Sequence, residues 1–229
     1  PLITIITLER AHELEPKAPS PFQRLETIRV LRKAGFKPML FLRPLIPGLE
    51  EEVEELLDEA KAHGAVGVVV GALRVSKKIL RRLEEVGLGK AIRSRLRAEP
   101  PEKGLVPVPV PELKEEVLEM AREKGLLAFR AACCANAFVA GVPCTGLCWL
   151  RGFCSNCPNR CVEKLPEVGE EEVKEALSRA FGLRALWVED EGLELAVGLA
   201  RSRGLSALLP KVRKALEVAT RRKVVLRVV

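Results

Sequence analysis

Cysteine is confined to one short stretch of this sequence. All seven cysteines among the 229 residues lie between Cys133 and Cys161. The last five follow the spacing C-x3-C-x5-C-x2-C-x3-C, and the first two stand just upstream. Thiolates this close along the chain can meet without help from distant parts of the fold, and they favour a soft metal. The predicted ligands are Cys148, Cys154, Cys157 and Cys161, with Cys144 as the substitute.

Three interpretations suit these thiols. Zinc takes four thiolates in a tetrahedron, at about 2.3 Å from each sulfur. A [4Fe-4S] cluster also takes four, and a proline often stands beside a ligand, as Pro158 does here. We favour the iron-sulfur cluster over zinc. Disulfides or structural thiols are the third interpretation, although an odd number of cysteines excludes complete pairing within the chain.

Alternating strands and helices precede the cysteines. Hydrophobic periodicity predicts three strands, each followed by a helix. The strands are expected over residues 2–8, 36–42 and 66–70, and the helices over 22–33, 50–62 and 76–86. Such βα repeats predict an α/β fold with a parallel sheet, whose functional groups gather at the carboxyl ends of the strands.

Two arginines lie at adjacent predicted strand ends. Arg43 follows the second strand and Arg74 follows the third, so the pair could hold a carboxylate or phosphate through paired N–H donors. Gly48 closes the turn over residues 44–48 and lets a ligand approach the backbone. The alternative is that both arginines are ordinary surface residues beside a tight turn.

Cys133 and Cys134 follow a further predicted strand, over residues 126–129. At least one of them could face the same mouth as Arg74. We therefore treat Cys133, Cys134 and Arg74 as candidate catalytic residues, with a thiol as hydrogen donor or as a further metal ligand. Buried small side chains are the competing interpretation of both cysteines.

Composition separates the chain into four expected segments. Alternating prolines between residues 98 and 111 indicate an extended connector. After Pro166 a helix, two strands, a helix and a strand follow in turn. We expect three βα units over 1–98, a connector with one helix and one strand over 99–130, a cysteine-rich metal-binding segment over 131–166, and a small α+β domain over 167–229.

Charge and hydropathy limit the class of protein. No run of roughly 18 apolar residues occurs, so we expect no membrane span and a soluble, cytoplasmic protein. The net charge of +7 suits an anionic partner such as nucleic acid, but the basic residues are mixed with glutamates and tyrosine is absent. Gln23 is the only glutamine, a bias that resembles proteins of thermophiles.

Several short motifs in the first ninety residues resemble the spore photolyase-like radical S-adenosylmethionine proteins. The most specific are the Glu15-Pro16 turn and the Ile46-Pro47-Gly48 turn. The others are the run over residues 4–9, residues 18–21 with Arg24, the Arg43-Pro44 pair and the Leu73-Arg74 pair.

This resemblance implies a fold, a cofactor and a set of roles. Residues 1–98 would be the last three βα units of a partial (β/α) barrel that binds S-adenosylmethionine. The cysteine segment would hold an auxiliary [4Fe-4S] cluster. The implied cofactor contacts are the Thr4 hydroxyl, Arg43, and the Ile46, Pro47 and Gly48 turn beside the adenine, with Arg74 facing the reaction chamber.

One element of the family pattern is missing. The C-x3-C-x2-C motif that holds the radical-generating cluster is absent, because no cysteine precedes Cys133. Since the sequence starts at Pro1, directly before a predicted strand, we expect the N-terminal half of the barrel elsewhere in the protein, as the partner that this part needs for activity. A degenerate relative without radical chemistry is the alternative.

Two functions of different class follow. The first is part of a radical S-adenosylmethionine enzyme, in which the cofactor carries the difficult chemistry. The second is a non-catalytic module, stabilised by zinc or an iron-sulfur cluster, that binds nucleic acid and must lose affinity steeply as salt rises. The substrate cannot be read from the residues, because similar folds serve many substrates.

Overall fold

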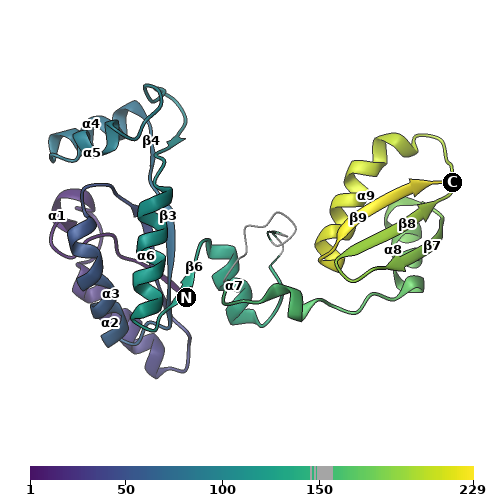
Figure 1. Cartoon of the computed structure of the whole chain (residues 1–229), viewed down its shortest axis with the longest axis horizontal. Coiled ribbons are helices and arrows are strands. Elements are labelled where there is room, and N and C mark those ends of the chain that lie inside the picture. The colour runs from purple at the N-terminus through teal and green to yellow at the C-terminus, as the bar shows by residue number, and fades with distance from the viewer. Residues whose placement is uncertain (145, 147, 149–156) are drawn as a thin grey trace. The chain divides into compact units, whose positions relative to one another are not determined.

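The computed structural model describes residues 1–144, 146, 148 and 157–229 (Figure 1). The protein is a mixed α/β chain with two compact units, Pro1–Ala135 and Asn136–Val229. The boundary between the two units falls within helix α7, Ala132–Ala140. This helix and the turn after it are continuous in sequence. Among the described residues, no helix combines the length and the apolar character that crossing a membrane requires.

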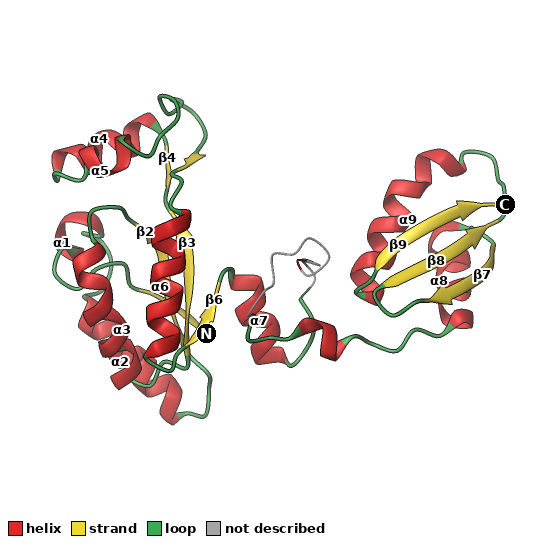
Figure 2. Cartoon of the chain, in the orientation of Figure 1, coloured by secondary structure: helices red, strands yellow, loops and turns green. Residues whose placement is uncertain are grey.

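A parallel sheet of four strands organises the first unit (Figure 2). The order is β1-β2-β3-β6, and every neighbouring pair is parallel. The strands are β1 Leu2–Thr4, β2 Met39–Leu45, β3 Gly67–Ala72 and β6 Leu127–Phe129. Gly67 lets the last pair approach closely, because a Cβ there would stand 2.4 Å from the Leu127 carbonyl oxygen. The parallel sheet predicted from the periodicity is confirmed.

Three helices pack side by side against this sheet. They are α2 Pro21–Lys33, α3 Val53–Ala62 and α6 Pro111–Glu123. Helix α2 packs on β1 and α3, while α6 packs on α3 and β3. Leu40 and Leu42 of β2 join the core that the helices cover, whereas Phe41 and Arg43 alternate to the opposite face of the sheet. That opposite face therefore carries the polar side chain at the strand end.

The remaining elements of the first unit are short. A two-stranded antiparallel sheet pairs β4, which follows β3, with β5 in the proline-rich connector. The elements are α1 Ala11–Leu14, the 3-10 helix η1 Glu50–Glu52, β4 Arg74–Val75, α4 Lys77–Glu85, α5 Gly89–Arg93 and β5 Val106–Pro107. Helix α4 begins after Ser76, whose hydroxyl accepts the Ile79 N–H.

The boundaries of two predicted strands were wrong. Strand β1 ends at Thr4 rather than at Leu8, because the chain turns there toward Glu52. Strand β2 continues through Pro44 to Leu45, where the sequence predicted a turn. Its register shifts between Leu42 and Leu45, since Pro44 has no N–H to give to the ladder.

The loop after β1 closes on one carboxylate. The buried Thr7 hydroxyl donates to Glu52, and the Leu8 and Glu9 N–H groups donate to the same oxygen at 3.0 and 3.3 Å. The Thr7 hydroxyl also accepts the Arg10 N–H. Two successive backbone N–H groups aimed at one anion form a nest, and Glu52 fills it.

The largely buried ion pair between Arg24 and Glu15 connects the turn at Glu15-Pro16 to strand β1. Arg24 donates to both carboxylate oxygens of Glu15, at 2.9 and 3.1 Å, and to the Thr4 carbonyl at 2.8 Å. The Arg24 side chain is only 11% exposed and that of Glu15 only 19%. The Glu15-Pro16 motif thus has a structural role, because it fixes the end of β1.

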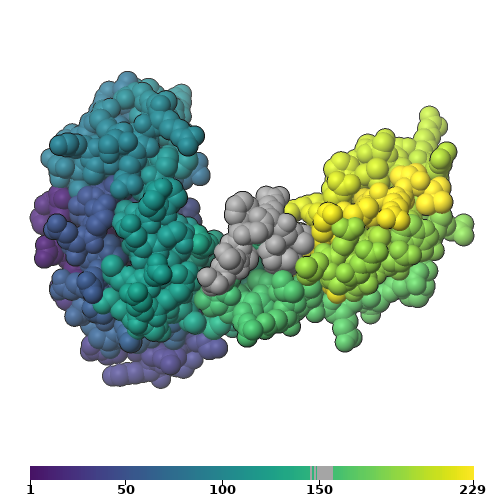
Figure 3. Space-filling model, viewed as in Figure 1, coloured from purple at the N-terminus to yellow at the C-terminus, as the bar shows by residue number. Residues whose placement is uncertain are grey.

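The second unit contains a three-stranded sheet and two helices (Figure 2). The space-filling view shows this unit in green to yellow (Figure 3). In the order β7-β8-β9, the first pair is antiparallel and the second is parallel. The elements are α8 Glu170–Phe181, β7 Ala185–Asp190, β8 Glu194–Leu199, α9 Leu205–Thr220 and β9 Lys223–Val228. Trp187 lies flat on Gly198, where a Cβ would meet the ring at 2.3 Å, and Arg227 lies over the same ring.

Candidate metal centre

Helix α7 positions the first two cysteines. It starts three residues after β6 ends, so Cys133 and Cys134 lie in its first turn. The Cys134 N–H donates to the Ala131 carbonyl at 3.1 Å, which closes that turn. Cys134 is buried and Cys133 is exposed. The predicted position of both cysteines after a strand is confirmed, but the helix that contains them was not predicted.

Three thiols of this stretch form a group that could hold a metal ion. The sulfur atoms of Cys133, Cys134 and Cys144 all lie within 4.8 Å of one another. Cys144 is buried and follows α7 by four residues, so the whole group belongs to one continuous run of chain. A cluster of cysteines competent for metal binding is therefore present.

Further cysteines lie around Cys144. Its backbone N–H donates to the sulfur of Cys161 at 3.2 Å, and the Gly146 N–H donates to the sulfur of Cys144 at 3.4 Å. A Cβ on Gly146 would stand 3.1 Å from the sulfur of Cys148 and 3.5 Å from that of Cys144. The missing side chain at Gly146 therefore leaves room for both sulfurs.

Asn159 is a buried polar residue beside this group, and no pattern in the sequence predicted its role. It is 0% exposed. Its amide nitrogen donates to the sulfur of Cys161 and to the Val142 carbonyl, both at 3.0 Å. Its amide oxygen accepts from the Lys164 ammonium at 2.9 Å. N–H donors aimed at a ligand sulfur orient it and stabilise its charge in metal sites.

The predicted ligands fall into three places. Cys144 belongs to the three-thiol group, and Cys148 and Cys161 lie beside it. Cys157 is half-buried nearby in sequence, and Cys154 lies outside the described residues. Among the cysteines that the structure describes, no disulfide joins one to another. Which four thiols bind a metal stays a prediction.

Arg43 and Arg74 line one pocket at the carboxyl ends of β2 and β3. Its volume is about 360 Å³, and the other lining residues are Phe41, Pro44, Ala72 and Leu73. Both guanidinium groups are exposed at this edge. The structure therefore brings the two arginines together, as their positions at adjacent strand ends led us to expect.

Lys114 of α6 connects this edge to the thiols electrostatically. Its ammonium donates to the Arg130 carbonyl at 2.8 Å. Burial, and then the positive charges of Arg130 and Arg43, lower the pKa of Lys114, while Glu115 and Cys134 oppose that shift. The sequence analysis had no signal for Lys114, because it occupies an ordinary position on a charged helix.

The other predicted cofactor residues are engaged within the chain. Thr4 is half-buried at the end of β1, and its carbonyl accepts from Arg24. Ile46 and Pro47 are buried, and the Gly48 N–H donates to Glu50 at 2.7 Å. S-adenosylmethionine binding by these residues stays a prediction from the resemblance.

Comparison with protein-family models, curated proteins and solved structures finds no match for this chain. The radical S-adenosylmethionine resemblance therefore remains an expectation.

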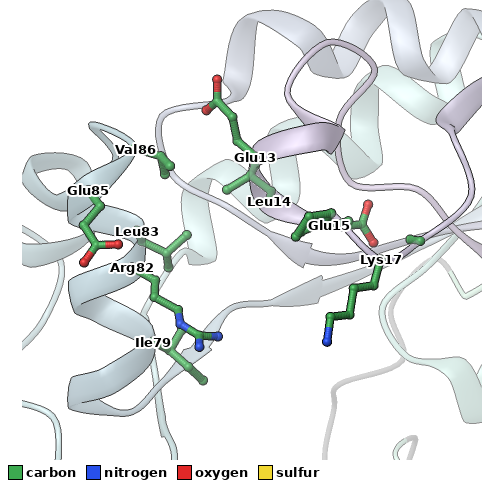
Figure 4. Close-up of a pocket in the computed structure, with 11 residues that line it drawn as sticks. Glu13, Leu14, Glu15, Lys17, Ile79, Arg82, Leu83, Glu85 and Val86 are labelled. Carbon is green, nitrogen blue, oxygen red and sulfur yellow. The ribbon is translucent and has the colours of Figure 1, made fainter.

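A larger hollow of about 970 Å³ lies away from the thiols, between the segment over residues 13–18 and helix α4 (Figure 4). Leu14 and Glu15 lie on one side of it, and Arg82 and Leu83 lie on the other. The Glu15 carboxylate is already paired with Arg24. We assign no chemistry to this hollow.

Proposed function

We propose that this chain carries a metal centre ligated by cysteine thiolates, and that it forms part of a radical S-adenosylmethionine enzyme in which this centre is an auxiliary iron-sulfur cluster. The observation that carries the metal centre is the approach of the sulfur atoms of Cys133, Cys134 and Cys144 to within 4.8 Å of one another. Thiolates are the ligands that iron-sulfur clusters and zinc share.

The donor set fits a soft cation. A tetrahedron with metal–sulfur bonds of about 2.3 Å has sulfur–sulfur edges of about 3.8 Å, so the three sulfurs need only a small movement to share one ion. A cluster with several irons needs wider spacing, which Cys148 and Cys161 could supply from beside Cys144. Backbone N–H groups already point at the sulfurs of Cys144 and Cys161.

The arrangement of helices supports a partial barrel as the setting. In a (β/α) barrel every helix packs on the outer face of the sheet, whereas a doubly wound sheet has helices on both faces. Here α2, α3 and α6 follow successive strands and pack side by side. In this proposal the sheet face opposite the helices, which carries Phe41, faces the barrel interior, and Arg43 and Arg74 lie at the rim formed by the carboxyl ends of the strands.

The protein groups have defined tasks in this proposal. An iron-sulfur cluster, when bound, supplies one-electron transfer or a ligand site for substrate. Cys134 and Cys144 hold it from buried positions, and Asn159 donates to the ligand sulfur of Cys161. Because Ile46 and Pro47 are buried, the S-adenosylmethionine part of the proposal is supported by the sequence resemblance alone.

Metal analysis after anaerobic purification tests the proposal. Iron, acid-labile sulfide and zinc are measured in the whole chain, in the Cys134→Ser/Cys144→Ser variant and in an Ala132→Ser control on the same helix. We expect iron and sulfide in the parent and control proteins and their loss in the double cysteine variant. Stoichiometric zinc without sulfide would reject the iron-sulfur assignment.

A second pair of variants separates the ligand sets. If the three-thiol group supplies the ligands, Cys134→Ser lowers the metal content more than Cys148→Ser does. The reverse order would favour the ligands predicted from spacing. A protein that binds neither iron nor zinc under these conditions would reject the metal centre itself.

A further inference from the structure

The pocket between the ends of β2 and β3 combines positive charge with an apolar lining. Arg43 and Arg74 supply the charge, and Phe41, Pro44, Ala72 and Leu73 supply most of the remaining surface. The carboxyl ends of parallel strands are where α/β proteins place their ligands. The pocket is thus at the expected place for binding, and its lining indicates what kind of ligand it accepts.

Within the part of the chain that the structure describes, the two arginines have no anionic partner. Among the described residues, no carboxylate lies within 4.0 Å of either guanidinium, the distance that defines the ion pairs found elsewhere in the protein. Arg24 is paired with Glu15 and Arg130 with Glu115. Two adjacent arginines without a counter-charge create a local positive potential that a ligand anion can neutralise.

Arg43 is held in place by its surroundings. Its side chain lies across Gly71 of β3, where a Cβ would come within 2.6 Å of the Arg43 Cδ. Its guanidinium carbon lies 5.9 Å from the centre of the Phe41 ring, within the range of a cation–π contact. Gly71 is therefore a site of close approach, and any larger residue must displace Arg43.

Among the described residues, one hydrogen bond holds the Arg74 guanidinium. Its Nη2 donates to the Leu105 carbonyl at 2.9 Å, across the small β4–β5 sheet. This bond uses one of the five N–H donors of the guanidinium and leaves others for a ligand. One anchored and one stacked arginine lose less side-chain entropy on binding than two unrestrained ones.

We propose that this pocket binds the oxyanion group of a ligand, a phosphate or a carboxylate, through Arg43 and Arg74, with the apolar part of that ligand against Phe41 and Leu73. Paired guanidinium donors match the geometry of both oxyanions. This anion site goes beyond the metal centre and does not require the metal to be bound.

The electrostatics at Lys114 support the same site. Arg43 is among the charges that lower the pKa of Lys114, so the positive potential of the pocket extends to α6. Cys134 acts on the same ammonium in the opposite direction.

Calorimetric titration with small anions tests the site. The whole chain is titrated with inorganic phosphate, with pyrophosphate and with acetate, at constant ionic strength set by chloride. We expect saturable binding of at least one of these anions. Tighter binding of phosphate or pyrophosphate identifies the ligand group as phosphate, and tighter binding of acetate identifies it as carboxylate.

Variants assign any binding to the pocket. Arg74→Gln and Arg43→Gln should each raise the Kd about tenfold or more, because each removes a charge-assisted pair of hydrogen bonds. The matched control is Arg29→Gln/Arg81→Gln, which removes two exposed positive charges from α2 and α4 and should leave the Kd unchanged.

Gly71→Ala supplies a test that changes no charge. Its added methyl group displaces Arg43, so it should weaken anion binding while Arg74 stays in place. Circular dichroism verifies that each variant is folded, and Arg74→Gln is the variant least able to disturb the four-stranded sheet, since Arg74 lies outside it in β4. The site is rejected if none of the three anions binds, or if the control variant weakens binding as much as Arg43→Gln does. Retention of the metal in Arg43→Gln keeps this outcome separate from failure of the metal centre.

Discussion

Replacing Asn159 by aspartate, with leucine for comparison, tests whether the sulfur of Cys161 carries negative charge when a metal is bound. Leucine removes the N–H donor that now lies 3.0 Å from this sulfur. Aspartate removes the same donor and places a carboxylate oxygen at the same point. Both variants therefore lack the hydrogen bond to the Cys161 sulfur, and only the aspartate variant adds repulsion between its carboxylate and that sulfur.

The magnitudes follow from the contacts. A hydrogen bond to a charged group contributes about 1.5–3 kcal/mol, so leucine should raise the metal Kd about tenfold to a hundredfold. At the 3.0 Å separation and an effective dielectric of about 20, the added repulsion is about 5 kcal/mol before the side chain relaxes. Lys164, 2.9 Å from the amide oxygen, offsets part of it. We expect aspartate to weaken binding about a hundredfold beyond leucine.

Cobalt(II) is a suitable probe for this comparison. Apoprotein is titrated anaerobically, and the thiolate-to-cobalt charge-transfer absorption reports binding. Urea unfolding of the apoproteins separates lost folding from lost affinity. Equal Kd values for Asn159→Asp and Asn159→Leu would refute the reasoning, because the repulsion exists only if the sulfur is charged.

Three other predictions concern the fold and its charges. Glu15→Gln leaves Arg24 largely buried without its counter-charge and should lower the free energy of unfolding in urea by about 2–4 kcal/mol; an unchanged midpoint would contradict this. Gly198→Ala places a methyl group against the Trp187 ring and should cost about 1–3 kcal/mol, measured by thermal unfolding. Burial lowers the pKa of Lys114 below its ordinary 10.5, so the unfolded chain binds a proton at this residue more readily than the folded chain does. The free energy of unfolding should therefore rise with pH in the window just below 10.5. Lys114→Met should remove that rise, which stability measurements across the window can detect.

Periodicity predicted the elements that have long apolar patterns. The helices over residues 22–33 and 50–62 and the run over 66–70 correspond to α2, α3 and β3, because each buries a continuous apolar face. The position of β6 in the sheet was not predictable, since a three-residue strand carries little pattern and its neighbour β3 is far away in sequence. The partial barrel remains a proposal.

The spacing of the cysteines predicted a metal-competent cluster, but of the three grouped thiols Cys144 was named only as a substitute ligand, and Cys133 and Cys134 only as possible further ligands. Helix α7 brings Cys133 and Cys134 close to Cys144. The spacing of the cysteines alone does not predict this helix, which starts shortly after β6. Asn159 was missed because a single asparagine has no pattern, and its role depends on contacts with Cys161 and Lys164 that exist only in the folded chain.

The loop after β1 bears on how anion titrations of this protein are interpreted. Its Leu8 and Glu9 N–H groups could attract a dissolved phosphate, but the Glu52 side chain already satisfies them. The Glu52 carboxylate thus occupies the position that a dissolved anion would take in this loop. Replacing Glu52 by glycine would leave these N–H groups free to bind a second oxyanion at a place other than Arg43. Glu52 should therefore not be mutated in any measurement of anion binding to the arginine pocket.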